Sequence, residues 1–343
     1  MKWLRRGVVA AAIAYPLLLL VAAVALRFVG ERWWVTTVAL YLPRLVLGAP
    51  LPFIVFGLFL CHASGWLWTQ AVGALLLLFP LMGLVVPVPR LANDKAPMVR
   101  VLSYNVNSAL GGPAKIGEEV ERYSPDVVFM QEIAQPEELK RVLSPRYPTV
   151  EISGQFLMAT RYAIVSTVDP ERLPFDGRIR SPRFLEYVMD TPLGHVGFYN
   201  VHPISPREDF YVLRGRGLRR EILSGRIFSG SAGPAILANA GLRALQVQSI
   251  AEAAGHDVEP VVIAGDTNLP GLSLVFGRHL SRFRDGFVDA GSGFGYTYPN
   301  DRRPWMRIDR ILATDALRFV RFQVGTSAAS DHLCVVADLQ RVR

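Results

Sequence analysis

Residues 261–271 read VVIAGDTNLPG: four apolar residues lead into Gly265, Asp266 and Asn268 lie two positions apart, and Pro270 ends the pattern. A short apolar run bounded by turn-forming residues is typical of a fully buried strand. Successive side chains of an extended chain point to opposite faces, so Asp266 and Asn268 share one face. The segment therefore predicts a buried strand that ends in a carboxylate and a carboxamide.

Five other strand-like segments also carry polar side chains, mostly at one end. These segments are residues 98–106, 126–133, 195–203, 307–313 and 330–340. Ligands of α/β sheets bind at the ends of strands, so we expect the polar side chains to meet in one site. The candidates that these segments supply are Asn105, Glu132, His202, Asp309, Asp331 and His332.

Each candidate alone also has a purely structural interpretation. Glu132 precedes the helix pattern PEEL, where an acid favours the helix N-terminus, and Asp266 suits a turn. Asp309 has arginines nearby in sequence as ion-pair partners, although strand alternation argues against that pairing. His332 lies in SDH, which resembles a helix cap, but a strand pattern follows it and leaves no helix to cap. Only the whole set favours a functional site.

The segment 98–343 mixes strand and helix patterns. Helix patterns occur at 114–123 and 136–143, and further ones, interrupted by Gly- and Ser-rich turns, extend to about residue 256. Additional strand patterns occur at 155–168, 184–190 and 317–324. Many strands with interspersed helices indicate a layered α/β domain with at least one large mixed sheet.

The N-terminal part is apolar over lengths that suit a bilayer. No charged residue occurs in 7–26 or in 45–89, and about 20 apolar residues suffice for one membrane-spanning helix. We predict an all-α transmembrane region over 1–86 with about three helices (7–29, 45–63 and 66–86), a linker over 87–97 and a catalytic domain over 98–343. A secretory signal is the alternative for the first run, but its apolar core is too long and lacks a cleavage site.

The distribution of basic residues bears on orientation and partners. Lys2, Arg5 and Arg6 favour a cytoplasmic N-terminus, so three spans place the catalytic domain outside the cytoplasm, although other arginines in the first external loop argue against this. Residues 1–97 carry +6 of the formal net charge of +8, next to the predicted membrane. The remaining +2 argues mildly against nucleic acid as a partner. We expect a multi-pass protein of the cell membrane, and no protein partner is predicted.

The candidate residues suit phosphate ester chemistry. Magnesium takes oxygen ligands and binds through one or two carboxylates together with substrate phosphate, and no Cys/His spacing of the zinc type occurs. Hydrolysis needs a positioned water, a cation that neutralises phosphate oxygens, and a donor for the developing charge. A histidine held by a carboxylate is such a donor.

Six blocks, LSYNV, PDVVFMQE, NVHP, VVIAGDTN, GYTYP with RIDRIL, and SDH, occur in this order. In order and spacing they resemble the endonuclease/exonuclease/phosphatase superfamily, whose members include deoxyribonuclease I, AP endonucleases, neutral sphingomyelinases and inositol polyphosphate 5-phosphatases. The resemblance covers residues 98–343. It implies a four-layer α/β/β/α sandwich of two packed mixed sheets, and it selects no substrate.

The resemblance also implies a metal site. Glu132 matches the glutamate that binds magnesium, Asn105 the asparagine that assists it, and Asp331 a supporting acid near the metal. The expected cofactor is Mg²⁺, for which Mn²⁺ can substitute. The block that usually reads GDFN has Thr267 in place of phenylalanine, so altered packing with retained chemistry is expected there.

Catalytic roles follow from the resemblance in the same way. Asp266 matches the aspartate that orients or deprotonates the attacking water, and Asn268 is its companion. His332 matches the histidine that contacts the scissile phosphate, and Asp309 the acid that holds this histidine. His202 matches a phosphate-binding or acid group on the leaving-group side.

Arginines supply candidates for substrate binding. Residues 205–233 follow His202 and are rich in arginine, including Arg207, Arg219 and Arg220, while Arg180 and Arg183 precede it. A basic flap that grips an anionic substrate is one interpretation, and a solvated helix face is the other. Charge reversal at Arg219 and Arg220 is predicted to raise KM if the flap exists.

The sequence as a whole predicts a membrane-tethered, metal-dependent phosphoesterase that hydrolyses phosphodiester or phosphomonoester bonds with an activated water. Its expected substrate is a lipid or another phosphorylated compound near the membrane. The first alternative is a nuclease that acts on extracytoplasmic DNA or RNA. The second alternative, a catalytically silent membrane scaffold, would require missing site residues, and all expected ones are present.

Overall fold

Two six-stranded sheets form the centre of the computed structural model, which describes residues 2–87, 96–207, 232–301, 303–326 and 329–342. The first sheet has the order β13-β14-β1-β2-β4-β3, and only β1 and β2 are parallel. Its strands are β1 (Val99–Asn105), β2 (Val127–Gln131), β3 (Thr149–Ser153), β4 (Phe156–Thr160), β13 (Leu317–Val324) and β14 (Val335–Arg341).

The second sheet repeats this plan with the order β11-β12-β10-β9-β8-β5, in which only β10 and β9 are parallel. Its strands are β5 (Ala163–Val168), β8 (Phe184–Thr191), β9 (Gly194–Val201), β10 (Val261–Asp266), β11 (Arg284–Asp285) and β12 (Asp309–Ala313). A separate two-stranded ribbon consists of β6 (Leu173–Phe175) and β7 (Arg178–Arg180). The quoted stretch at 261–271 thus supplies a central strand, as its apolar run predicts.

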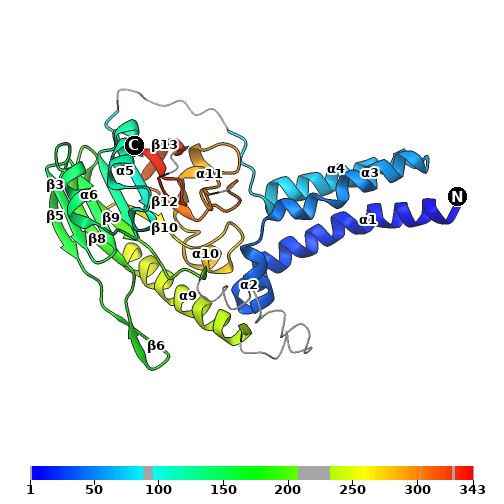
Figure 1. Ribbon diagram of the computed structural model, residues 1–343, viewed down its shortest axis with the longest axis horizontal. Coiled ribbons are helices and arrows are strands. Elements are labelled where there is room, and N and C mark those ends of the chain that lie inside the picture. Colours follow the sequence, from blue (N-terminus) through cyan, green and yellow to red (C-terminus); the bar gives the residue numbers. More distant parts are fainter. Residues whose placement is uncertain (1, 88–95, 208–231, 302, 327–328, 343) are drawn as a thin grey trace.

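Three apolar cores separate four layers (Figure 1). The core between the sheets contains Phe129 and Phe198 from facing strands. Helices α5 (Pro113–Tyr123) and α6 (Pro136–Leu143) cover the outer face of the first sheet, and α9 (Ala232–His256) and α10 (Leu274–His279) cover that of the second. A short helix, α11 (Gly286–Ala290), packs near β12 and β13. The predicted four-layer α/β/β/α sandwich is confirmed.

A buried polar pair joins the two sheets beneath the strand ends. Gln131 Nε2, at the end of β2, donates to Asn200 Oδ1 of β9 at 2.8 Å. Asn200 Nδ2 in turn donates to the carbonyls of Met130 and Leu157 in the first sheet, both at 3.2 Å. Because buried polar groups favour partners with defined geometry, these bonds set how the sheets meet near the candidate site.

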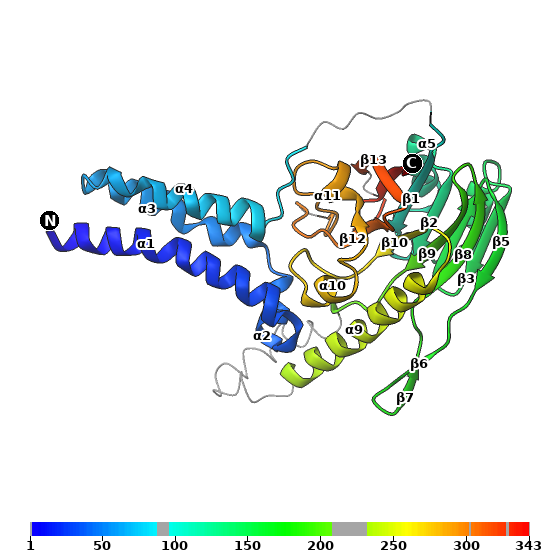
Figure 2. The same ribbon diagram turned by 180° about the vertical axis from the view of Figure 1, so that it is seen from behind.

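The N-terminal residues form helices that extend away from the sandwich (Figure 2). Lys2–Arg32 and Ser64–Leu81 are long and apolar enough to cross a membrane, and Trp34–Leu40 with Arg44–Leu60 make a third candidate if this pair, bent by 93°, counts as one span. The elements are α1 (Lys2–Val24), α2 (Trp34–Leu40), α3 (Pro50–Leu60) and α4 (Leu67–Leu76), joined by shorter helical turns that include η3 (Arg44–Gly48). Most large exposed apolar side chains of the described residues lie on these helices, as expected of a lipid-facing surface.

Some sequence predictions differ from the structure or lie outside the described residues. The sequence predicts a second helix from residue 45 only, so it predicts neither α2 (Trp34–Leu40) nor the bend between α2 and the segment Arg44–Leu60. Most of the predicted linker and much of the arginine-rich segment, including Arg219 and Arg220, lie outside the described residues. The helix pattern before residue 256 corresponds to α9.

Candidate active site

The carboxyl ends of the two parallel strand pairs meet at one edge of the sandwich. Asn105 ends β1, Glu132 follows β2, His202 follows β9 and Asp266 ends β10. Asp309 begins β12, and it is in register with Asp266 because β12 runs antiparallel to β10. Each sheet thus contributes acidic and neutral polar groups to the same place.

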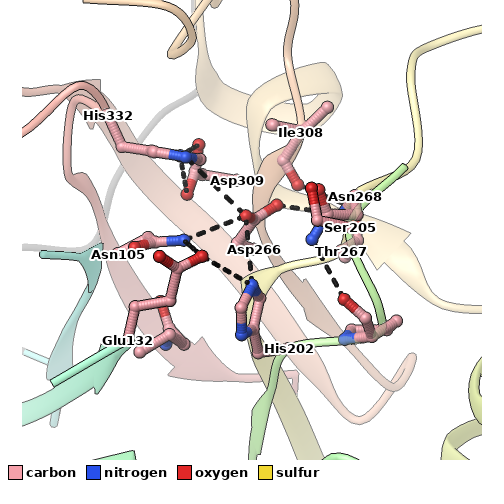
Figure 3. A network of polar contacts seen from close by, with 12 residues as sticks. Asn105, Glu132, His202, Ser205, Asp266, Thr267, Asn268, Ile308, Asp309 and His332 are labelled. Atoms are coloured by element: carbon pink, nitrogen blue, oxygen red, sulfur yellow. Dashed lines mark hydrogen bonds and ion pairs between the residues drawn. The ribbon is translucent and has the colours of Figure 1, made fainter. Parts of the chain in front are cut away.

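These side chains form a cluster around Asp266, which we call the Asp266 cluster: Asn105, Glu132, His202, Asp266, Asp309 and His332 (Figure 3). Asn105 Nδ2 donates to Glu132 Oε1 and to Asp266 Oδ2, both at 3.1 Å. His202 Nε2 lies 3.2 Å from Glu132 Oε1 and 3.6 Å from Asp266 Oδ2. The structure therefore brings together most of the side chains that the strand ends predict.

The carboxylate of Asp309 holds His332, the arrangement that the family resemblance implies. Its Nδ1 lies 3.0 and 3.2 Å from the two oxygens of Asp309, and its Nε2 lies 3.8 Å from Asp266 Oδ2. The ring packs on Tyr298 with 4.6 Å between ring centroids. Burial alone would lower the pKa of His332, but the charges of Asp309 and Asp266 raise it to about 10. His332 is thus a protonated donor at neutral pH.

The two carboxyl groups nearest His202 have opposite pKa shifts. Burial would raise the pKa of Glu132, but contact with His202 and the hydrogen bond from Asn105 lower it to about 2. Burial and the charge of Asp309 raise the pKa of Asp266, against the opposing effect of His332 and His202. The site therefore holds one carboxylate that stays ionised and one that accepts a proton more readily.

The loop after β10 fixes Asp266 from its own backbone. Asn268 has φ +50°, a conformation that asparagine tolerates better than most residues, and its N–H donates to Asp266 Oδ1 at 2.8 Å. Asn268 Nδ2 donates to the carbonyl of Pro203 at 3.0 Å. Thr267 donates from its N–H and its hydroxyl to the carbonyl of Ile308, so it packs against the start of β12 and takes no place in the cluster.

The donor set fits a divalent cation. Ligand atoms of Glu132, His202 and Asp266 lie within 4.8 Å of one another, and those of Asp266, Asp309 and His332 form a second such group. His202 Nδ1 contacts Gln155 Oε1 at 2.7 Å, whereas Nε2 is buried without a hydrogen-bond partner among the described residues. Two carboxylates that converge with a ring nitrogen in this way fit a divalent cation.

Asp331 lies beside the Asp266 cluster rather than in it. Its Oδ2 is 3.5 Å from Arg207 Nη1, and burial raises its pKa against the opposing charges of His332 and Arg207. Asp331 is in neither group of candidate ligands. Of the other predicted arginines, Arg183 has its carbonyl bonded to the His202 N–H, and Arg180 ends β7 in the separate ribbon.

Four residues near the site were not expected from the sequence. Gln155 orients His202, Tyr298 packs on His332, and Ser330 Oγ donates to the Asn105 carbonyl at 2.8 Å. Tyr41, from the N-terminal helices, donates its hydroxyl to the Asn268 carbonyl at 2.7 Å. Ser330 and Tyr298 belong to the quoted blocks SDH and GYTYP, which is a signal, but no pattern in the sequence points to Gln155 or Tyr41.

Comparison with known proteins identifies the family. The sequence model of the Endonuclease/Exonuclease/phosphatase family matches residues 102–332, which is more than half of the chain. The protein therefore belongs to the endonuclease/exonuclease/phosphatase family, as the resemblance implies. With the buried cluster, this membership makes it a metal-dependent phosphoesterase by class.

Solved structures support the fold. An endonuclease/exonuclease/phosphatase from Beutenbergia cavernae is 20% identical with a TM-score of 0.51, covering 71% of this chain and 72% of its own. One from Bacteroides vulgatus is 16% identical with a TM-score of 0.53, covering 71% and 99%. A mannosyl-6-phosphatase from Bacteroides thetaiotaomicron is 16% identical with a TM-score of 0.51, covering 70% and 99%. The curated proteins include no match. At these identities the likeness extends to the fold alone.

Proposed function

We propose that the protein is a membrane-tethered phosphoesterase that hydrolyses a phosphate ester of a lipid, or of another phosphorylated compound near the membrane, with an activated water. The Asp266 cluster carries this proposal, because it combines a fixed carboxylate, a second carboxylate and a carboxylate-held histidine at one edge of the fold. Transition states of phosphate esters need such charge complementarity.

Each member of the Asp266 cluster has a proposed role. Glu132 and Asn105 hold a divalent cation, Mg²⁺ or Mn²⁺, with Asp331 as a supporting acid. When bound, this cation neutralises charge on phosphate oxygens. Asp266, with Oδ1 fixed by the Asn268 N–H, uses Oδ2 to orient or deprotonate the water. His332 donates from Nε2 to the phosphate while Asp309 holds Nδ1.

His202, Asn268 and the arginines have proposed roles at the substrate. His202 serves the leaving-group side, where Gln155 fixes the orientation of its ring. Asn268 acts as the companion of Asp266 through its backbone and side chain. Arg207, which is exposed beside Asp331, binds the anionic substrate. Arg219, Arg220, Arg180 and Arg183 are proposed for the same role.

The position of the site supports a substrate at the membrane. Ile308, which precedes Asp309, packs in one apolar cluster with Tyr15 and Leu19 of α1. Figures 1 and 2 show the N-terminal helices leaving the sandwich on the side of α10. The division into a transmembrane region (1–86), a linker (87–97) and a catalytic domain (98–343) is part of the proposal, as is the extracytoplasmic orientation of that domain.

The test uses the full chain in detergent with Mg²⁺ or Mn²⁺, beside Asp266→Asn and a control, Asp257→Asn. Asp257 is a carboxylate at the opposite end of β10 that accepts from Tyr199 at 2.8 Å. The substrates are bis(4-nitrophenyl) phosphate, 4-nitrophenyl phosphate, plasmid DNA, and vesicles of phospholipid or sphingomyelin. We expect metal-dependent turnover that Asp266→Asn lowers by about 1000-fold or more and Asp257→Asn leaves unchanged.

Each outcome of this assay bears on the proposal. Turnover by Asp266→Asn at the wild-type rate would overturn the role of the cluster, and a folded wild-type protein that hydrolyses none of the substrates would favour the silent scaffold. Preference for DNA over vesicles would favour the nuclease, against which the small charge of residues 98–343 argues mildly.

A further inference from the structure

The loop that carries Asn268 is bonded to the N-terminal helical region. Tyr41, just after α2, donates its hydroxyl to the Asn268 carbonyl at 2.7 Å, and Trp305 Nε1 donates to the Tyr41 carbonyl at 3.1 Å. The guanidinium of Arg243, on α9, lies 5.8 Å from the centroid of the Tyr41 ring. Only 9% of Tyr41 is exposed. Three residues of the sandwich therefore hold Tyr41, one each at its hydroxyl, its carbonyl and its ring.

A second set of bonds fixes the end of the same loop. The carboxylate of Glu31 accepts from the Leu274 N–H at 2.9 Å and from the Ser273 hydroxyl. Arg27 Nη1 donates to the Ser273 carbonyl at 3.3 Å. Ser273 also caps α10 by accepting from the Phe276 N–H at 3.1 Å. The loop from Asp266 to α10 is thus attached to the helical region at two points.

The bond from Tyr41 acts on the residue that orients Asp266. The N–H of Asn268 donates to Asp266 Oδ1, and the carbonyl of Asn268 accepts from Tyr41. Asp266 Oδ2 then faces Asn105, His202 and His332. The φ of Asn268 is +50°, a conformation that residues other than glycine adopt infrequently. The backbone therefore depends on its hydrogen bonds to Tyr41 and Asp266 to keep this conformation.

We propose that Tyr41 is a positioning residue of the active site, so that the N-terminal helices complete the site in addition to any role in anchoring. This inference rests on the proposed phosphoesterase function. The helical region holds the Asn268 backbone, and through it the Asp266 carboxylate, in the orientation that the reaction needs. The orientation of a catalytic carboxylate affects kcat more than it affects substrate affinity.

The test compares Tyr41→Phe with Tyr15→Phe in the full chain. Tyr15 is the matched control, because it is 6% exposed and its hydroxyl also donates to a backbone carbonyl, that of Leu47 in η3, at 3.0 Å. We expect Tyr41→Phe to lower kcat about tenfold with KM within about twofold of wild type, as a buried carbonyl left without its partner implies. Tyr15→Phe should leave both constants near wild type.

Hydrogen–deuterium exchange gives a readout that does not need turnover. Tyr41→Phe should speed exchange in residues 266–274 and leave residues 261–265 of β10 unchanged, whereas Tyr15→Phe should change neither. Wild-type kcat in Tyr41→Phe, equal losses in both variants, or unchanged exchange in 266–274 would each overturn the inference. If the wild-type protein shows no turnover, the proposed function fails, while the exchange comparison still decides whether Tyr41 holds the loop.

Discussion

Replacing Asp309 by asparagine tests how the charge of His332 is set. Asp309 contributes the largest of the effects that raise the pKa of His332 to about 10, against burial, which lowers it. Asparagine keeps the size of the side chain and removes the charge. An opposite charge at this distance changes a pKa by about 1 to 3, so we take a decrease of about 2, worth about 2.7 kcal/mol.

The sign of the effect on activity follows from the role of His332 as a donor. The raised pKa keeps His332 protonated through neutral pH, and the donor is lost as pH rises through that pKa. At pH 9 about nine tenths of His332 is protonated in wild type, and about one tenth is protonated after a decrease of 2. Asp309→Asn should thus lower kcat about tenfold at pH 9 and by a smaller factor at pH 7 if charge alone matters.

The assay is the pH profile of kcat on bis(4-nitrophenyl) phosphate from pH 6 to 10 at saturating Mn²⁺. The alkaline limit is the pH above which kcat falls. A cation at Glu132 lowers this limit in both proteins, so wild type and Asp309→Asn are compared at one metal concentration. Asp257→Asn is the control and should keep the wild-type profile. An Asp309→Asn protein whose alkaline limit equals that of wild type would refute the reasoning.

Two further predictions concern metal binding and stability. Glu132→Gln should weaken Mn²⁺ binding at least about tenfold in a titration followed by electron paramagnetic resonance, and an unchanged Kd would remove Glu132 from the metal site. Asp285→Asn should lower the free energy of unfolding by about 3–5 kcal/mol, because Asp285 pairs with buried Arg310 at 2.8 Å and with Arg307. The charges of the two arginines lower the pKa of Asp285 despite its burial, so this stabilisation is present at neutral pH and lost as pH falls through the folded pKa. Denaturant unfolding at pH 7 and pH 3 should show a larger loss at pH 7, and equal losses would contradict the ion-pair explanation.

Alternation and apolar runs predicted the central strands and the edge at which the site lies. Asn105, Glu132, His202 and Asp266 each follow or end a buried strand whose pattern is unambiguous. Strands with mixed burial gave weaker patterns. The edge strand β3 is only half-buried along most of its length, and β6 and β7 have three residues each. Such segments depend on their neighbours more than on periodicity.

The grouping of side chains within the site could not be predicted from order along the chain. Asp331 adjoins His332 in sequence, yet its carboxylate lies beside Arg207. His202 and Asp266, which are far apart in sequence, have ligand atoms close to that of Glu132. Residue order places a side chain at an edge, whereas packing decides where its oxygens point. Tyr41 and Asn268, which are 227 positions apart, meet only because the helical region packs on the loop after β10.

β14 is the last strand of the chain to be synthesised, yet it lies inside the first sheet, between β13 and β1. Its Leu339 pairs with Val99 of β1. During synthesis β1 therefore waits for a strand that leaves the ribosome more than two hundred residues later, with an open edge on which other chains can pair. The N-terminal helices emerge before any of the sandwich, so attachment to a membrane would keep nascent copies apart in that interval. A product that stops before Val335 would lack the strand that closes the first sheet, and we expect such chains to aggregate rather than to accumulate as a smaller folded form.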